Sequence, residues 1–425
     1  MQVLQFPPRI TWDTILKRPQ IDLIDLEPAV RSIMNDVRQD GDKAVIAYNK
    51  KFDAVESSSF LVNESEIVDS ESLINEDLKD AIRAAAANIE LFHRKQISEP
   101  EHVTTMPGVE CWRKSIGIEK VGLYIPGGTA PLFSTVLMLG IPAVLAGCKE
   151  IVLCTPPPKS GTLHPAILYA AKVAGIRSIF KVGGVQAIAA MTYGTETIPQ
   201  VYKIFGPGNQ YVTLAKQIAQ TAGVAIDMPA GPSEVAVFAD ATAKASFVAA
   251  DLLSQAEHGI DSQVLLVTTS EQLIDKVQQE LDIQMRLLPR MEFAMKSLES
   301  SRIILVESDN EAMELLNAYA PEHLILACAN PAELANKVVN AGSVFLGHYS
   351  PESVGDYASG TNHTLPTNGY ARAYSGVSID SFVKKITFQR VSKEGLLHIG
   401  PIVEAMAAAE GLYAHQQAVA VRYER

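Results

Sequence analysis

The sequence lacks the features that mark several whole classes of protein. Its 425 residues include only four cysteines, which are scattered without CxxC spacing and form neither a disulfide framework nor a zinc-finger site. The formal net charge is −12 and no run of lysine and arginine supplies a basic face, which argues against a nucleic-acid partner. No apolar run approaches the ~18 residues of a membrane span, and the first residues lack a basic region followed by an apolar core. We therefore expect a cytoplasmic protein that acts on a small molecule and binds neither nucleic acid nor membrane.

The chain does contain enough apolar residues for two or more hydrophobic cores, because 47% of it is hydrophobic and 20% is charged. Residues 1–104 carry apolar side chains at helical spacing, interrupted by an acidic stretch, "ESSSFLVNESEIVDSES", for which we expect a solvated loop or a short strand pair. From Val121 onward, short β-rich runs such as "EIVLCT" alternate with helical runs such as "HPAILYAAKVAG". A second series of the same kind begins near "EVAVFAD". This alternation predicts βαβ crossovers and parallel sheets.

The predicted fold is therefore α/β, with two doubly wound Rossmann-like domains of mainly parallel sheets, a helical N-terminal region and a small C-terminal tail domain. The approximate borders are 1–104 for the N-terminal region, 105–230 and 231–348 for the two Rossmann-like domains, and 349–425 for the C-terminal part. That last part opens with a Gly- and Ser-rich loop too long for a mere connector, so we expect it to be functional. Near its end, Gly411 is expected to interrupt the helix.

Glycine-rich segments lie at or beside the ends of predicted strands: "YIPGGTAP", "KVGGVQA", "FGPGNQY" and "PAGPSEV". Parallel sheets bind ligands at the carboxyl ends of their strands, and such turns let backbone amides approach an anion or a sugar. None of the segments is GxGxxG, and any one alone is explained as a tight turn. The set of segments favours a nucleotide or phosphate-bearing ligand.

The stretch "DLLSQAEHGID" suggests a metal site. Gln255 and His258 are three residues apart, which places them on one face of a helix that Gly259 ends. A histidine in that place is also explained as a cap that complements the helix dipole. Further along, Asp356 lies seven residues before His363, and imidazole, carboxylate and amide groups all bind zinc. Spacing alone leaves both interpretations open.

The stretch "YAPEHLIL" suggests acid–base chemistry, because Pro321 breaks a helix just before an apolar strand and presents Glu322 and His323 together. Histidine acts as a general base near neutral pH, and the carboxylate could activate a water molecule. The same segment is also explained without catalysis, as a surface glutamate and a half-buried histidine at a helix–strand corner.

Taken together, several segments resemble the histidinol dehydrogenase family. They run in order from about residue 121 to the C-terminus: "GLYIPGGTAP", "GGVQAIAA", "FGPGNQYV", "PAGPSEV", "DLLSQAEHG", "APEHL", "SVGDYASGTNHTLPT" and "EGLYAHQQA". The resemblance implies a zinc- and NAD-dependent enzyme that oxidises L-histidinol through L-histidinal to L-histidine. It also implies a homodimer in which the C-terminal segment completes the partner's active site.

The same resemblance assigns residues to roles. The catalytic residues it implies are His323 as general base and Glu322 as the group that activates water. The implied zinc ligands are Gln255, His258, Asp356 and His415. Substrate contacts fall on these ligands and on Ser233, His323, His363 and Glu410. The implied NAD contacts are Tyr124, Gln186 and Asn209.

Rival classes remain open at this point. A zinc hydrolase would use the same residues with a metal-bound water and no nicotinamide. A cysteine-dependent aldehyde oxidation would form a thiohemiacetal on Cys148 or Cys154, although both lie around the apolar strand "IVLCT", where a small packing residue is the ordinary explanation. A binding module without catalysis would give the base and the water-activating residue no role.

Overall fold

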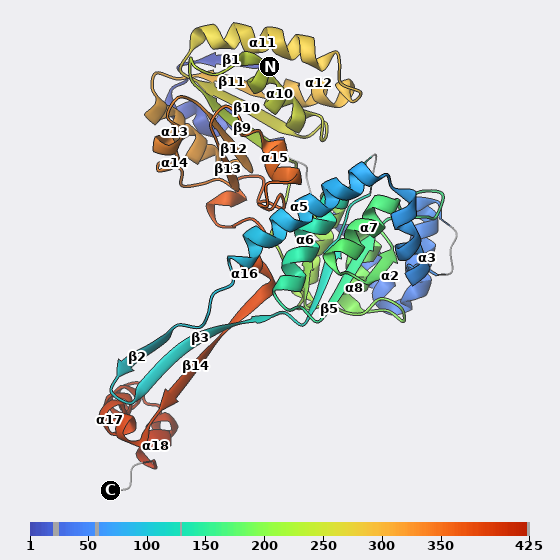
Figure 1. The fold of residues 1–425 in the computed structure, drawn as a ribbon. Helices are drawn as coiled ribbons and strands as arrows, with labels where there is room; N and C mark the ends of the chain where they lie inside the picture. The colour runs from blue at the N-terminus through green and yellow to red at the C-terminus, as the bar shows by residue number, and fades with distance from the viewer. Residues whose placement is uncertain (20–24, 56–58, 128–129, 423–425) are drawn as a thin grey trace.

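The computed structural model describes residues 1–19, 25–55, 59–127 and 130–422. Two α/β bodies lie next to each other, and a long ribbon leads away from one of them to a helical tail (Figure 1). No helix among the described residues is both long and apolar enough to cross a membrane. The mainly parallel, doubly wound architecture predicted from the alternating runs is confirmed.

The first body is built on a parallel sheet with the strand order β6-β5-β4-β7-β8. Its strands are β4 (Lys120–Tyr124), β5 (Glu150–Thr155), β6 (Ser178–Lys181), β7 (Lys203–Phe205) and β8 (Ala225–Ile226). Its crossover helices are α6 (Phe133–Leu145), α7 (Pro165–Ala174), α8 (Gly184–Tyr193) and α9 (Gln210–Thr221). Because the order reverses between β4 and β7, this sheet has the switch point at which doubly wound folds bind ligands.

N-terminal helices pack against this first body, with α2 beside α8 and α9, and α5 beside α6 (Figure 1). They are α2 (Glu27–Asp40), α3 (Asp42–Tyr48), α4 (Glu64–Asp69) and α5 (Glu76–Arg94), with the short elements η2 (Asn49–Asp53) and η3 (Ser70–Leu73). The acidic stretch thus contains helix α4 where we expected a loop or strand pair. A reciprocal capping box between Asn63 and Glu66 accounts for the difference, because it satisfies backbone amides at the start of α4.

The second body repeats the same strand order and adds one strand, giving β1-β11-β10-β9-β12-β13 with every pairing parallel. Its strands are β1 (Gln2–Gln5), β9 (Glu234–Ala239), β10 (Gln263–Thr268), β11 (Arg302–Leu305), β12 (His323–Ala327) and β13 (Ser343–Leu346). Its helices are η1 (Arg9–Thr11), α1 (Trp12–Ile15), α10 (Ala245–Ala256), α11 (Glu271–Met285), α12 (Met291–Glu299), α13 (Asp309–Tyr319) and α14 (Pro331–Ala335). The N-terminal region is therefore not only helical, because residues 2–5 form an edge strand of this sheet.

The ribbon is an antiparallel sheet of β2 (His102–Met106), β3 (Val109–Gly117) and β14 (Val383–Val391), with β3 in the middle. The tail at its end consists of α17 (Lys393–Ala409) and α18 (Tyr413–Ala420), which pack on each other. The chain between the second body and the ribbon contains α15 (Glu352–Tyr357), η4 (Tyr370–Arg372) and α16 (Ile379–Phe382). The ribbon pairs residues near 110 with residues near 390 far outside both bodies (Figure 1).

Candidate active site

The chain after α13 turns sharply and carries Glu322 and His323 into the protein interior. Ala320 adopts φ 54°, a left-handed conformation that residues other than glycine seldom take, and Pro321 follows it. Glu322 is 6% exposed and His323 is 3% exposed. Since His323 is the first residue of β12, the pair lies at the amino ends of the strands, the sheet edge opposite to the one that doubly wound folds normally use for ligands.

Hydrogen bonds hold the His323 ring from both sides. Its Nδ1–H donates to the Glu234 carbonyl oxygen at 3.2 Å, and its Nε2 lies 3.2 Å from Asp356 Oδ1. Because a carbonyl only accepts, Nδ1 must carry a proton, which leaves Nε2 as the atom that can gain or lose one. The Glu322 carboxylate lies 3.7 Å from Nδ1. The ring is thus oriented for proton transfer at Nε2.

Burial and charge shift the pKa values of this pair. Burial by itself lowers the pKa of His323, but the carboxylates of Glu322 and Asp356 outweigh it and raise the pKa above its ordinary value. Burial raises the pKa of Glu322, an effect that the nearby His323 ring partly offsets. The pKa of Glu322 therefore lies nearer to neutrality than that of a free carboxylate, whereas the pKa of His323 lies above that of a free imidazole. Strongly shifted, buried acid–base pairs of this kind are typical of functional sites.

Glu234, the first residue of β9, connects the pair to a distant part of the chain. Its backbone N–H donates to Glu322 Oε2 at 2.8 Å, and its carbonyl accepts from His323. Its buried carboxylate forms a bidentate ion pair with Arg18, at 2.5 and 2.8 Å, and accepts from the Asn368 backbone N–H at 2.6 Å. The Arg18 guanidinium also lies 4.0 Å from the centre of the Tyr319 ring. Sequence reasoning missed Arg18 and Glu234, since nothing in either local segment reveals a contact across more than 200 residues.

Three of the predicted zinc ligands come together in the same region. Gln255 lies in the last turn of α10, is fully buried, and has no hydrogen-bond partner within the protein for either Oε1 or Nε2. His258 follows one turn later, and burial lowers its pKa while Asp356 opposes that shift. Burial on its own raises the pKa of Asp356, but the imidazoles of His323, His363 and His258 hold it below its usual value. An amide oxygen, a neutral imidazole and an ionised carboxylate are a suitable donor set for a divalent cation.

The described residues of one chain do not supply a complete set of His, Cys, Asp and Glu metal ligands. Across residues 1–19, 25–55, 59–127 and 130–422, no group of three or more His, Cys, Asp and Glu side chains could hold a metal ion. Of the four predicted zinc ligands, this region contains His258, Asp356 and the amide of Gln255. The unpaired Oε1 of Gln255 still fits a bound cation, because it is an acceptor and a buried polar atom without a partner is unfavourable.

Glu352, at the start of α15, belongs to the same region and was also missed. It is 1% exposed, accepts a hydrogen bond from Ser254 at 2.8 Å, and its Oε2 has no partner within the protein. Burial raises its pKa to about 8. Ser254 immediately precedes Gln255, so this bond ties the helix of Gln255 to the helix of Asp356. The only sequence signal for Glu352 is its position four residues before Asp356.

The remaining predicted substrate residues divide into two groups. His363 bridges the bodies, since its Nδ1–H donates to the Asp356 carbonyl at 2.8 Å and its Nε2 lies 3.0 Å from the Thr135 hydroxyl of α6. Ser233 directly precedes Glu234 at the start of β9 and is half-buried. Glu410 and His415 are exposed and lie in the tail, at the far end of the ribbon from the other site residues (Figure 1). Within one chain, the structure does not bring these last two residues to the site.

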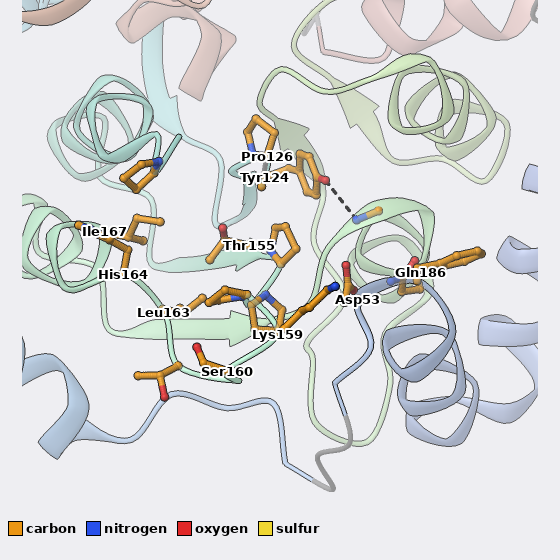
Figure 2. A pocket seen from close by; sticks show the side chains of 18 of the residues that line it. Asp53, Tyr124, Pro126, Thr155, Lys159, Ser160, Leu163, His164, Ile167 and Gln186 are labelled. Atoms are coloured by element: carbon orange, nitrogen blue, oxygen red, sulfur yellow. Dashed lines mark hydrogen bonds between the residues drawn. The ribbon is translucent and has the colours of Figure 1, made fainter. Parts of the chain in front are cut away.

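A cavity of about 1630 Å³ lies at the carboxyl edge of the first sheet. Three of the glycine-rich segments follow β4, β6 and β7 there, although Gly128 and Thr129 of the first lie outside the described residues. Tyr124, Gln186 and Asn209, the predicted NAD contacts, all line this cavity. The Tyr124 hydroxyl accepts from the Gly184 N–H at 3.1 Å, as Figure 2 shows. Asn209 Oδ1 caps α9 by accepting from two backbone amides, so this residue also has an ordinary structural function.

The cysteines proposed for a thiohemiacetal are poorly suited to that chemistry. Cys154 lies in β5 and is fully buried, and burial raises the pKa of its thiol. Burial also raises the pKa of Cys148 to about 11, and its Sγ lies 3.7 Å from the Phe382 carbonyl. Because the thiolate is the nucleophile, both thiols are inert near neutral pH.

Comparison with known proteins gives a consistent result over nearly the whole chain. The family model described as histidinol dehydrogenase matches residues 16–423. Histidinol dehydrogenase of Bacteroides thetaiotaomicron is 61% identical over 422 residues, which are 99% of each chain. Histidinol dehydrogenase of Xanthomonas euvesicatoria pv. vesicatoria is 52% identical and is covered over 95% of its length by 96% of this chain. The crystal structure of histidinol dehydrogenase from Elizabethkingia anophelis superposes with a TM-score of 0.97 at 56% identity, with 99% of this chain and 98% of that one covered.

Proposed function

Because this chain belongs to the histidinol dehydrogenase family, we propose that it oxidises L-histidinol through L-histidinal to L-histidine, with NAD as the hydride acceptor and zinc as a bound metal. The single observation that carries the proposal is the buried pair of Glu322 and His323, fixed between Glu234 and Asp356. The proposed reaction consumes one histidinol, two NAD and one water, and releases one histidine, two reduced nicotinamides and protons. The cytoplasmic location expected from composition is part of the same proposal.

The residues that would hold zinc are Gln255, His258 and Asp356 of one chain and His415 of a second chain. Zinc would supply a template for the imidazole and amino groups of the substrate, which positions the alcohol carbon. The protein's own contribution is a rigid frame. Gln255 is fixed in the last turn of α10, and Asp356 Oδ1 is kept in place by the His323 ring. Glu352 joins the two helices through Ser254.

In the first oxidation, His323 would take the proton of the substrate hydroxyl at Nε2. Its Nδ1–H bond to the Glu234 carbonyl keeps the other nitrogen protonated, so only one tautomer is available. NAD, held in the cavity of the first sheet, would accept the hydride in each of the two oxidations. General acid–base groups of this type contribute roughly 10²–10⁴-fold to a rate.

In the second oxidation, the aldehyde must first gain a water molecule, and Glu322 would take the proton that this water loses. Its carboxylate is anchored by the Glu234 N–H, and burial keeps its pKa raised, which makes it a stronger base than an ordinary carboxylate. The enclosed position of the pair would keep the aldehyde in place between the two steps.

We also propose a homodimer with shared active sites. Glu410 and His415 lie in the tail, which the ribbon carries away from both bodies of its own chain (Figure 1). The tail exposes large apolar side chains, among them Leu397, Ile402 and Met406, as a segment that packs on another subunit would. A two-fold interface would place each tail at the site of the other subunit.

The experiment that tests the proposed function is a stoichiometry measurement. Purified protein is incubated with L-histidinol and NAD, with and without a chelator, and reduced nicotinamide is counted per histidine formed. We expect two, and loss of turnover with the chelator. A ratio of one with accumulated histidinal would refute the two-step reaction, and unchanged histidinol with no reduced nicotinamide would refute the dehydrogenase and favour the zinc hydrolase.

A further inference from the structure

Buried polar atoms without a hydrogen-bond partner gather in the cavity of the first body. In the described part of the chain, three of the residues with such an atom line this cavity: Asp53 through Oδ2, Thr155 through Oγ1 and Gln186 through Oε1. They come from separate elements, since Asp53 ends η2, Thr155 ends β5 and Gln186 lies in the first turn of α8. Buried polar groups in folded proteins are normally paired, so three unpaired ones facing one space indicate a ligand that supplies the partners.

The chemistry of these three atoms restricts what the ligand must offer. An ionised carboxylate and an amide oxygen only accept hydrogen bonds, and a threonine hydroxyl can accept as well. The ligand must therefore present hydrogen-bond donors to this wall. On a dinucleotide, the neighbouring hydroxyl groups of a ribose are donors of this kind, and a carboxylate can accept from both at once.

The position of Asp53 suits such a role. It belongs to the N-terminal helices that close the cavity from the side opposite the strands, and Figure 2 shows its carboxylate on the same side as Gln186. Asp53 and Tyr124 both line the cavity. Burial raises the pKa of Asp53. The exposed Lys51 and Lys159 also line the cavity and suit the diphosphate, which leaves Asp53 for a neutral part of the ligand.

We propose that Asp53 is a specificity-determining residue, which accepts hydrogen bonds from a ribose diol of the dinucleotide and excludes a ribose that carries a 2′-phosphate. In proteins with a GxGxxG turn, an acidic residue after the second strand has this function. That turn is absent here, and the carboxylate comes instead from a helical segment outside the sheet. An anion held beside the diol would repel the added phosphate charge of NADP.

This inference rests on the proposed function, because it takes NAD to be the occupant of the cavity. It is tested by equilibrium binding of NAD and of NADP to Asp53→Asn and Asp53→Ala, measured by calorimetry on the protein as purified and without histidinol, so that no turnover occurs. We expect NAD to bind on the order of tenfold to a hundredfold more weakly to Asp53→Ala, the range for losing hydrogen bonds to a charged group. NADP should bind more tightly to Asp53→Asn than to the wild type.

A matched control is Asp40→Asn, which removes one negative charge from the exposed end of α2 and should leave both dissociation constants unchanged. Thermal unfolding shows whether each variant is folded. If Asp53→Asn is folded and keeps the wild-type preference for NAD, the inference is wrong while the proposed function stands. If both ligands weaken equally, Asp53 only shapes the cavity and the inference is equally wrong. A wild type that produces no reduced nicotinamide from histidinol with either dinucleotide overturns the proposed function itself.

Discussion

Removal of the Arg18 guanidinium should destabilise the second body and displace the catalytic pair. The Arg18 side chain is 12% exposed and that of Glu234 is 3% exposed, so the ion pair is largely shielded from water. In Arg18→Ala, the Glu234 carboxylate keeps the Asn368 N–H but loses both bonds to the guanidinium. Breaking a buried pair on one side costs about 3–5 kcal/mol, because the remaining charge is left without compensation. We expect a loss of that size in the free energy of unfolding, measured by urea denaturation.

The double variant Arg18→Ala/Glu234→Gln separates charge from packing. Since it removes the uncompensated carboxylate, it should be more stable than Arg18→Ala alone. Arg18→Met is a second control, because it keeps an unbranched side chain against the Tyr319 ring and loses only the charge. If Arg18→Met is as stable as the wild type, or if the double variant is no more stable than Arg18→Ala, the ion pair is not what holds this region. The turnover of histidinol should fall together with stability, because the backbone of Glu234 is hydrogen-bonded to both catalytic side chains.

Other predictions address the proposed chemistry directly. Glu322→Gln should impair oxidation of supplied histidinal far more than hydride transfer from histidinol, whereas His323→Ala should slow the alcohol step as well, by roughly 10²–10⁴-fold; small, equal losses in both half-reactions would contradict these roles. His258→Ala should lower zinc content and activity together, by metal analysis and assay, and a zinc-free but active variant would remove the metal from the proposal. Mixing inactive His258→Ala chains with inactive His415→Ala chains should restore activity, because one site of each heterodimer then carries neither lesion; a mixed dimer that forms and stays inactive would place the histidine in its own chain's site. Because burial raises the pKa of Cys148 to about 11, iodoacetamide at pH 8 should leave this thiol unmodified, and Cys148→Ala should retain turnover; a folded, zinc-loaded but inactive variant would restore the thiohemiacetal alternative.

The fold could be predicted from the sequence as far as local patterns reach. Alternating apolar runs predicted both doubly wound halves, because each βαβ unit is a local arrangement. The strand β1 could not be recognised, since "QVLQ" is short and half polar and becomes a strand only by pairing with residues 302–305. The segment "FVKKITFQRVS" is strand-like in sequence and forms β14, but its pairing with β3 could not be predicted, because the two strands lie more than 260 residues apart.

The candidate site shows a similar division. Glu322 and His323 are adjacent in sequence, and the family resemblance implies a role for each from the sequence alone. The groups that orient them, Arg18 and Glu234, are separated in sequence and have no local signature. The structure brings Gln255, His258 and Asp356 into one region, while the assignment of zinc and of His415 remains a prediction.

The pairing of β1 also affects the order in which the two bodies fold during synthesis. Residues 2–5 leave the ribosome before their partners in the sheet, residues 302–305, which follow about 300 residues later. During that interval the sheet and the crossover helices of the first body, residues 27–226, can form, although Val377 and Phe382 join its core later. The second body waits for both ends of its sheet. Contacts over such a separation form late, because the entropy of closing the loop must be overcome first. Residues 2–5 are therefore synthesised well before they can take their final place in the sheet.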